Sequence, residues 1–508
     1  MLLQSSTDPH TSSRGDFAAL ISLALLVAVV HMLTNGRYGF HRDELQVLDD
    51  ARHLALGYVA YPPFTPFVER VSLALFGTSL VGLRFFSVLA QAAVVILSGL
   101  MVRELGGRRL AQLVAATSVT ISPFALFNGT EFQYGSFDYL WWVLAAYFVI
   151  RLLRTDGPCW WLAIGLAIGL GMLTKYTMAF FVAGIVGGVL LTPARRHLRS
   201  AWLWCGVALA VLVFLPNLVW QVRHHFVSLD FLRHIHARDV GEGRADHFLR
   251  DQFLTSTNLL AAPLWLAGLV YVFASPHGKR LRMIGWMYAI PLALFAISKG
   301  RGYYLAPAYP MLFAAGAVWG ERWVNSLARG WKRFVLAVEF LSLAMGAAAP
   351  AAIILPLFPV GSPHKLALRV NGDLREEIGW PELVATVAQI RDSLPADKRN
   401  GVGILAGNYG EAGAIDLYGP ARGLPAAISG VNSFWQRGYG DPPPGTLIVI
   451  GFSREFVDAN FQSCAYAGHN ANPYGLKNEE SELRPDIFVC DAPRKSWPEF
   501  WSHFQYYG

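Results

Sequence analysis

Long apolar stretches alternate with short polar ones along most of this chain. A helix that crosses a lipid bilayer needs about 20 mainly apolar residues. Eleven stretches fit this requirement, at residues 17–35, 81–102, 109–127, 137–153, 159–174, 176–192, 201–220, 253–273, 283–298, 303–320 and 334–356. The pattern therefore predicts a polytopic α-helical membrane protein.

The pattern changes near residue 366, where strand-like and helix-like stretches begin to alternate. An amphipathic stretch at 380–394 precedes the apolar runs VGILAG, TLIVIGF and DIFVC, and the helical stretch NYGEAGAIDLYG follows the first run. Such alternation is typical of a small α/β domain. We therefore expect a transmembrane domain at residues 1–365 and a soluble α/β domain at residues 366–508.

The composition agrees with this division. Of the 508 residues, 54% are hydrophobic and only 15% are charged, whereas soluble domains carry about 25% charged residues. The net charge of +7 does not indicate a nucleic-acid partner, because most Lys and Arg residues stand in clusters between apolar runs. Residues 1–16 are polar and no cleavage motif follows, so we expect no cleavable signal peptide.

Five basic clusters predict the orientation of the helices. When the eleven stretches are counted in order, all five clusters fall on one side, which the positive-inside rule makes cytoplasmic. The N-terminus is then cytoplasmic, and residues 366–508 lie outside. The clusters are Arg103, Arg108 and Arg109; Arg151 and Arg154; Arg195, Arg196 and Arg199; Lys279, Arg280 and Arg282; and Arg322, Arg329, Lys332 and Arg333.

Four cations oppose this orientation signal. Lys175, Lys299 and Arg301 fall at connections on the outer side, and Arg84 lies a few residues into the second helix from that side. One interpretation is that Lys175 and Arg84 extend toward lipid headgroups. Ionisable residues at membrane depth are functional candidates by default, so we favour binding of an anionic group.

Acidic residues gather on the same side. Asp43 and Glu44 are adjacent in the first outer loop, residues 38–66, and Glu131 and Asp138 belong to the second. A carboxylate can take a proton from an attacking hydroxyl or amine, and cations can stabilise a leaving phosphate. These groups together indicate transfer from a phosphorylated lipid. The alternative interpretation is a set of interhelical ion pairs.

A third outer segment, residues 221–250, is rich in histidine. Its histidines are His224, His225, His234, His236 and His247. Their spacing matches no metal-ligand pattern. We expect a solvated or headgroup-facing loop here, and no metal site.

Two motifs resemble those of the GT-C glycosyltransferases. The resemblance is to the branch of the family 39 type, which holds the protein O-mannosyltransferases and the bacterial lipid A aminoarabinose transferases. Asp43 and Glu44, followed by YPP at 61–63, resemble the first outer loop of that family, although Tyr61 stands where the family often has His. The segment SKGRGYYLAPAYP, with Lys299, Tyr303 and Tyr304, resembles the second motif.

The resemblance implies a GT-C fold of about 11 transmembrane helices and an inverting glycosyltransferase in the bacterial inner membrane, with a periplasmic C-terminal domain. Its donor would be a polyprenyl-phosphate sugar, carried on undecaprenyl phosphate in bacterial relatives, and no metal cofactor is required, although some GT-C enzymes use a divalent ion. The acceptor would be lipid A, another lipid, a glycan or a protein hydroxyl.

The resemblance also assigns roles to individual residues. Asp43 would be the general base. Its neighbour Glu44, a further candidate, points elsewhere in any extended or helical geometry, so we expect it to orient a backbone group or pair with a cation. Asp138 would be the second acid, with Glu131 as its rival. The donor would be bound by Arg84, Lys175, Lys299, Arg301, Tyr303 and Tyr304.

A transporter or flippase of lipid-linked sugars is the alternative function. It would also place cations within the membrane, but it should contain matching half-molecules with interrupted helices, and the sequence contains no such repeat. A non-enzymatic scaffold would not need acids and cations on one face.

The four cysteines fall into two groups. Cys159 and Cys205 lie in apolar segments, and Cys464 and Cys490 lie in the polar C-terminal region. Because disulfides persist in oxidising compartments, we expect Cys464 and Cys490 to pair outside the cytoplasm.

Overall fold

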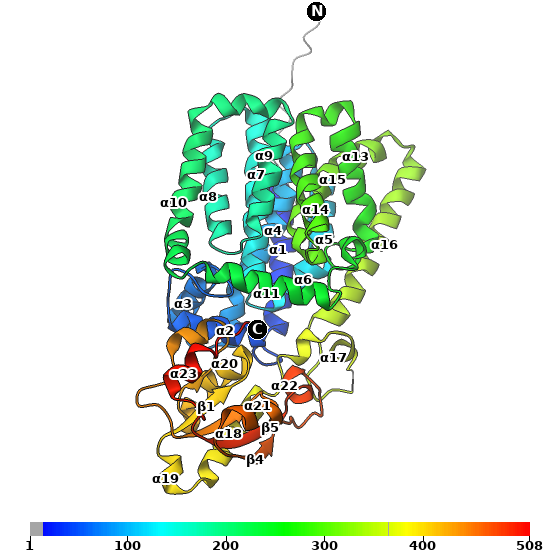
Figure 1. Cartoon of the computed structure of the whole chain (residues 1–508). Coiled ribbons are helices and arrows are strands. Elements are labelled where there is room, and N and C mark those ends of the chain that lie inside the picture. Colours follow the sequence, from blue (N-terminus) through cyan, green and yellow to red (C-terminus); the bar gives the residue numbers. More distant parts are fainter. Residues whose placement is uncertain (1–13, 364) are drawn as a thin grey trace, which may run out of the picture.

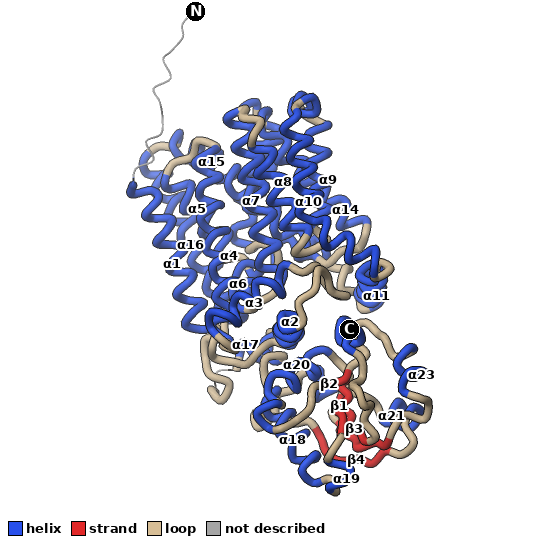
Figure 2. The backbone as a smooth tube through the Cα atoms, turned by 90° about the vertical axis from the view of Figure 1, so that its left-hand side faces the viewer, coloured by secondary structure: helices blue, strands red, loops and turns tan. Residues whose placement is uncertain are grey.

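The computed structural model describes residues 14–363 and 365–508 as a long helical bundle with a sheet-containing part at one end (Figures 1 and 2). The bundle helices are α1 (Arg14–Thr34), α4 (Leu80–Glu104), α5 (Arg109–Thr120), α6 (Pro123–Thr130), α7 (Tyr134–Thr155), α8 (Trp160–Met172), α9 (Met178–Leu190), α10 (Ala201–Arg223), α13 (Ala262–Ala274), α14 (Arg282–Ile297), α15 (Tyr309–Ser326) and α16 (Arg329–Ile354). Each of the eleven predicted stretches overlaps at least one of these helices.

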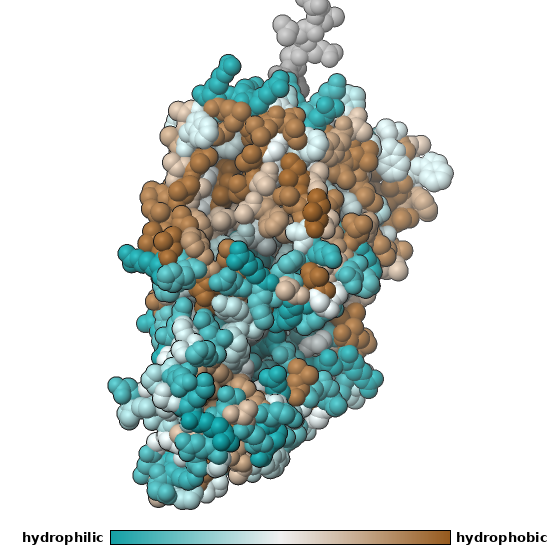
Figure 3. All heavy atoms as spheres, viewed as in Figure 1, coloured by the Kyte–Doolittle hydropathy of each residue, from teal (hydrophilic) through white to brown (hydrophobic). Residues whose placement is uncertain are grey.

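The prediction of a polytopic helical protein is confirmed, whereas the predicted number of eleven spans is not. Within the described residues, six helices are long and apolar enough to cross a membrane, or up to nine if each bent pair forms one span. Figure 3 shows the apolar side chains as a broad band over the bundle, between hydrophilic surfaces at its two ends.

Helix breaks occur where the sequence supplies helix-starting signals. Between α5 and α6 the axis bends by 65°, because Ser122 caps α6 through the backbone N–H of Ala125 and Pro123 occupies its first turn. Between α8 and α9 the break falls at residues 173–177, which include Lys175. The predicted division of residues 159–192 into two helices is thus confirmed.

Three helices lie at the end of the bundle that faces the C-terminal part. They are α2 (Arg42–Arg52), α3 (Phe64–Phe76) and α11 (Val227–Gly241), and Figure 1 shows α11 running across the base of the bundle. The segment at 221–250, expected to be a solvated or headgroup-facing loop, is therefore largely helical, and most of its residues are exposed. Ser228 of α11 donates a 2.8 Å hydrogen bond to the carbonyl of Tyr58, which fixes this helix over the segment between α2 and α3.

The C-terminal part contains one five-stranded sheet of order β2-β1-β3-β5-β4. Strand β1 pairs in parallel with β2 and β3, whereas β5 is antiparallel to both β3 and β4. The strands are β1 (Val402–Ala406), β2 (Ala427–Ile428), β3 (Thr446–Ile450), β4 (Cys464–His469) and β5 (Asp486–Asp491), and the helices are α17 (Leu366–Val370), α18 (Trp380–Ser393), α19 (Ala396–Arg399), α20 (Tyr409–Tyr418), α21 (Arg454–Asn460), α22 (Glu479–Glu482) and α23 (Trp497–Ser502).

The central strands are buried on both faces. One face packs against α18 and α20, and the other against α21 and α23. Strands β1 and β3 therefore read as continuous apolar runs, which made them visible in the sequence. Strand β4 is largely exposed and β2 has only two residues, so neither carries an apolar run by which it could have been predicted.

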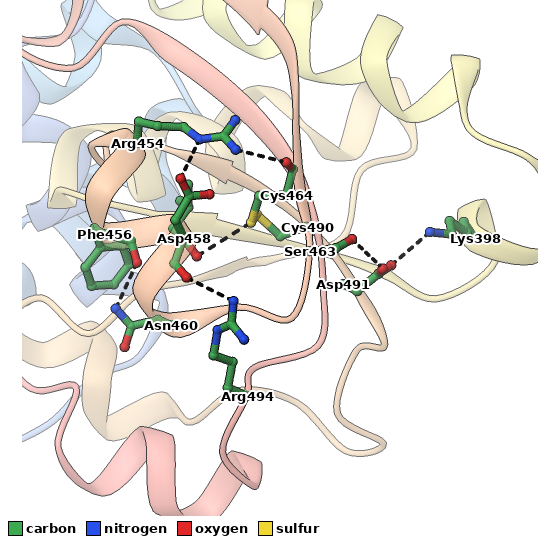
Figure 4. Close-up of a disulfide and its surroundings, with 11 residues drawn as sticks. Lys398, Arg454, Phe456, Asp458, Asn460, Ser463, Cys464, Cys490, Asp491 and Arg494 are labelled. Carbon is green, nitrogen blue, oxygen red and sulfur yellow. Dashed lines mark hydrogen bonds and ion pairs between the residues drawn. A yellow bond between two sulfur atoms is a disulfide. The ribbon is translucent and has the colours of Figure 1, made fainter.

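A disulfide joins the two strands at the sheet edge. Cys464 of β4 stands directly opposite Cys490 of β5 in the strand register, and their sulfur atoms are 2.04 Å apart. Figure 4 shows the polar contacts around it: Asp491 accepts hydrogen bonds from Ser463 Oγ at 2.9 Å and from Lys398 Nζ at 2.8 Å. These contacts fix the strand end beside the disulfide.

The two parts of the molecule share a continuous apolar core. Leu45 and Val47 of α2 belong to the same buried cluster as Trp380 of α18 and Ala412 of α20. Helix α2 is thus packed between the bundle and the sheet-containing part, which leaves it little freedom to move independently of either.

Candidate active site

A cavity of about 660 Å³ lies between α2, α11, the C-terminal part and the end of the bundle that faces that part. Acidic and basic side chains from these elements line it together. Its charged and histidine side chains are His41, Arg42, Asp43, Lys175, His236, Arg238, Asp239, Arg244, Lys299, Arg301, Asp373, Glu376 and Glu479.

The start of α2 points Asp43 toward this cavity. His41 is the N-cap residue, and its Nδ1 accepts from the backbone N–H of Asp43 at 3.2 Å. The Asp43 carboxylate is 33% exposed and accepts two hydrogen bonds, from Tyr409 Oη at 2.8 Å and from Gln133 Nε2 at 3.2 Å. A carboxylate in the first turn of a helix is also stabilised by the helix dipole.

Glu44 points away from the cavity. As the third residue of α2 it completes a capping box, accepting from the backbone N–H of His41 at 2.8 Å. Its other oxygen accepts from the backbone N–H of Phe132 at 2.8 Å, and the side chain is fully buried. The two adjacent acids therefore separate, with Asp43 open to the cavity and Glu44 inside the protein.

Glu131 is linked to Asp43 through a shared amide. Gln133 Nε2 donates to Glu131 Oε2 at 2.5 Å as well as to Asp43, and His41 Nδ1 is 3.7 Å from the same Glu131 oxygen. Burial raises the pKa of the Glu131 carboxyl well above its usual range, with further contributions from neighbouring acids. The burial therefore favours the neutral form of the Glu131 carboxyl, which is linked to the partly exposed carboxylate of Asp43.

Asp138 does not line the cavity. It lies inside the bundle on α7, where it accepts from Trp142 Nε1 at 3.0 Å and from Thr177 Oγ1 at 3.2 Å. The structure therefore does not bring this predicted catalytic acid together with Asp43. Its rival Glu131 is the acid connected to Asp43.

Lys175 stands in an aromatic surround at the break between α8 and α9. Its Nζ lies 4.5 Å from the ring centre of Tyr304, 5.0 Å from that of Tyr134 and 5.5 Å from that of Tyr303. Such contacts hold an ammonium group without neutralising it. Lys175 therefore keeps its charge available to an anion in the cavity.

Lys299 and Arg301 line the cavity from the connection after α14. Lys299 is exposed and adopts a left-handed backbone with φ of 51°. Arg301 makes a bidentate ion pair with Asp239 of α11, at 2.6 and 2.8 Å, and donates to Tyr303 Oη at 3.1 Å. Of the two predicted tyrosines, Tyr304 lines the cavity and Tyr303 stands behind Arg301 and Lys175.

Arg84, a predicted donor contact, lies away from the cavity. Its guanidinium is completely buried and donates to Glu44 at 2.8 and 2.7 Å. It also lies 3.4 Å from Glu377, which comes from the segment before α18, and it is not part of the cavity wall. Its N–H groups are directed to protein groups, which are Glu44 and the backbone carbonyls of Asn35 and Gly39.

Several cavity residues were not singled out from the sequence. Tyr409, Glu376 and Glu479 belong to the C-terminal part, and Arg238 and Arg244 belong to the α11 region. No local pattern marks any of them, because each reaches the cavity only through the packing of distant segments. Across residues 14–363 and 365–508, no cluster of three or more His, Cys, Asp or Glu side chains is arranged to hold a metal.

Comparisons with known proteins converge on one group of proteins. Residues 60–220 match the family model described as dolichyl-phosphate-mannose-protein mannosyltransferase. The chain is 27% identical over 391 residues to the lipid A galacturonosyltransferase RgtD of Rhizobium johnstonii, a match that covers 74% of this chain and 78% of that protein. It is 28% identical to an undecaprenyl phosphate-alpha-4-amino-4-deoxy-L-arabinose arabinosyl transferase of Pseudomonas fluorescens, across 58% of this chain but only 55% of that protein.

The fold matches a solved structure over nearly its whole length. ArnT from Cupriavidus metallidurans, crystallised with undecaprenyl phosphate, superposes with a TM-score of 0.58 and 15% sequence identity, covering 95% of this chain and 99% of that one. The bundle and the sheet-containing part thus share one overall arrangement with that protein.

Proposed function

We propose that this chain, whose predicted resemblance to the GT-C glycosyltransferases is confirmed, transfers a sugar from a polyprenyl-phosphate donor to a lipid A or lipopolysaccharide acceptor. The observation that carries the proposal is the cavity in which Asp43 faces Lys175, Lys299 and Arg301. A carboxylate and several cations in one pocket are the groups that displacement of a phosphate by a hydroxyl or amine requires.

Each group has a defined part in the proposed reaction. The acceptor oxygen or nitrogen attacks the anomeric carbon of the donor sugar and loses its proton to Asp43. The bond from that carbon to the phosphate oxygen breaks, and the electron pair leaves with the polyprenyl phosphate. Lys299 and Arg301, with Lys175 behind them, stabilise the phosphate as it gains charge. A single displacement of this kind inverts the anomeric centre.

Undecaprenyl phosphate is the carrier we favour. It is named for several relatives and is the ligand of the crystallised ArnT. The apolar belt of the bundle reaches the level of α11, so a polyprenyl tail can remain in lipid while its phosphate enters the cavity (Figure 3). The relatives differ in the sugar that they carry, and both aminoarabinose and galacturonic acid are donors to test.

We further propose that the cavity opens on the periplasmic side of the inner membrane. The basic ends of several helices meet at the opposite end of the bundle: Arg151 of α7 is 2.7 Å from Glu104 of α4, and Glu321 of α15 accepts from the backbone N–H of Arg108 at 2.9 Å. By the positive-inside rule, that end is cytoplasmic. Residues 1–365 then form the transmembrane catalytic domain and residues 366–508 the periplasmic domain.

The test uses the purified full-length chain in detergent with lipid A as acceptor. Two synthetic donors are supplied separately, undecaprenyl phosphate-linked 4-amino-4-deoxy-L-arabinose and undecaprenyl phosphate-linked galacturonic acid. We expect release of free undecaprenyl phosphate together with a sugar-bearing lipid A for one of them. A flippase would instead move an intact donor across vesicles without cleaving it, and that result would overturn the proposal.

A further inference from the structure

The C-terminal part places one tyrosine hydroxyl directly on the carboxylate of Asp43. Tyr409 is the first residue of α20, and its hydroxyl donates to Asp43 Oδ1 at 2.8 Å. The two residues are separated by 366 positions in the sequence. The contact therefore crosses from the sheet-containing part to the first outer segment of the bundle.

The packing of α20 on α2 makes this contact a fixed one. A Cβ on Gly413 would lie 2.7 Å from the carbonyl oxygen of Leu45, and one on Gly410 would lie 2.8 Å from Cβ of Arg42. These two glycines, three residues apart, thus lie on one face of α20 and let the helices approach at backbone distance. No larger residue fits at either position without moving α2.

The start of α20 is also held independently of Asp43. Asn408 and Glu411 form a capping box, with Asn408 Oδ1 accepting from the backbone N–H of Glu411 at 2.8 Å. On the other side, the Arg42 guanidinium lies over the Tyr409 ring at 5.5 Å and pairs with Glu479. The cap fixes the backbone from which Tyr409 projects and the Arg42 guanidinium covers its ring, so its hydroxyl has little freedom to turn from Asp43.

We propose that Tyr409 is a positioning residue of the active site, whose hydroxyl holds the Asp43 carboxylate in the orientation and charge state of a general base. The inference rests on the proposed function, in which Asp43 takes the proton of the acceptor. A hydrogen bond donated to a carboxylate favours its ionised form. Tyr409 donates to Oδ1 of Asp43 and Gln133 donates to Oδ2. One lone pair on each oxygen is thus used, and the others remain for a proton from the cavity.

The hydroxyl of Tyr409 is suited to donate at all working pH values. Burial raises its pKa well above the usual range, and the Asp43 charge adds to this. Other titratable or charged groups also face the pair and have to be separated from it in any pH measurement. They are His41 and Arg42 of the α2 start, Tyr61, Glu131, Tyr134, Lys175 and Glu479.

The first test does not depend on turnover. In the full-length chain, Tyr409→3-fluorotyrosine gives a fluorine resonance beside the hydroxyl, which is followed against pH. We expect a titration step that disappears when Asp43→Asn is added, while the neighbouring groups still titrate. The same label at Tyr418, at the other end of α20, should show no step that depends on Asp43. A step at position 409 unaffected by Asp43→Asn would overturn the proposal.

The second test measures catalysis with the donor and lipid A pair that the wild-type chain uses. Tyr409→Phe removes only the hydroxyl, so we expect kcat to fall about tenfold with the KM for donor within twofold. The acidic limb of the kcat/KM profile should move up by about one pH unit, because the base loses a hydrogen bond that favours its charge. Tyr418→Phe should leave both quantities unchanged.

The outcomes separate this inference from the proposed function. The melting temperature shows whether Tyr409→Phe is folded. If the folded variant has the pH profile of wild type, the positioning role is overturned while the proposed transferase function stands. A wild-type chain that transfers neither sugar would overturn the proposed function, and the fluorine titration would still decide whether Tyr409 bonds to Asp43.

Discussion

Arg84 and Glu44 form a completely buried ion pair, with Nε to Oε1 at 2.8 Å and Nη2 to Oε2 at 2.7 Å. The pair connects α4 of the bundle to α2, and Glu377 from the C-terminal side lies 3.4 Å from the same guanidinium. One cation thus joins three parts of the chain. This geometry explains why Glu44 is withdrawn from the cavity that its neighbour Asp43 enters.

We first predict that Arg84→Met acts on stability and not on donor binding. Removing one partner of a buried pair costs about 3–5 kcal/mol, because the remaining charge is left uncompensated. Thermal unfolding in detergent should show this loss, while folded Arg84→Met should bind undecaprenyl phosphate within twofold of wild type. Tenfold weaker binding in a fully stable variant would return Arg84 to the phosphate site.

The second prediction concerns Lys299, whose charge faces the cavity. Removing a cation from a phosphate contact loses a charge-assisted hydrogen bond, worth about 1.5–3 kcal/mol. Lys299→Ala should therefore weaken the binding of undecaprenyl phosphate by about tenfold or more, measured by calorimetry at low salt. Lys279 is an exposed lysine at the basic end of the bundle. Lys279→Ala is therefore the matched control and should bind undecaprenyl phosphate like wild type.

The third prediction tests the base. Asp43→Asn keeps the side-chain volume and removes the basicity, so turnover should fall at least about a hundredfold while undecaprenyl phosphate binding persists. Glu131→Gln and Asp138→Asn are compared in the same assay. Full activity of Asp43→Asn, with a loss in one of these two, would move the base to that residue.

A fourth prediction follows from the disulfide between Cys464 and Cys490, which are separated by 26 residues. Closing a loop of that length stabilises by about 3.5 kcal/mol in the chain-entropy model. We expect Cys464→Ser and Cys490→Ser each to lower the melting temperature of the full-length chain, and the double variant to be no worse than either. Complete alkylation of both thiols in unreduced, denatured wild type would contradict the pairing.

The fifth prediction is a pH dependence of stability at Glu377. Burial raises the pKa of this carboxyl from 4.5 to about 8, opposed by Arg84 and reinforced by Glu44. Between these two values the folded chain retains a proton that the unfolded chain has lost, so the free energy of unfolding falls as pH rises.

Glu377→Gln should remove that dependence. The melting temperature of Glu377→Gln should decline less than that of wild type between pH 5 and pH 8, because the variant cannot release a proton at this position on unfolding. One such proton changes the free energy of unfolding by at most about 1.4 kcal/mol per pH unit. Asp397→Asn changes an exposed acid of α19 and should follow the wild-type curve. Identical slopes for all three proteins would show that Glu377 is ionised in the fold.

The sequence by itself determined the features that depend on local pattern. Apolar runs of membrane length located the bundle helices, buried parallel strands appeared as the runs at 402–406 and 446–450, and the adjacency of Asp43 and Glu44 marked the first outer segment. In each case the signal lies within a few turns or strands of chain, where side-chain periodicity follows directly from backbone geometry.

Only the tertiary structure decided which charges face the cavity. Arg84 and Lys299 look alike in the sequence as cations on the outer side, but Glu44 and Glu377 enclose the first and leave the second exposed. Tyr409 carries no local sign of its place beside Asp43, because that place is set by how α20 packs on α2 across 366 residues. Such contacts depend on the fit of whole surfaces, which a local hydrophobic pattern does not encode.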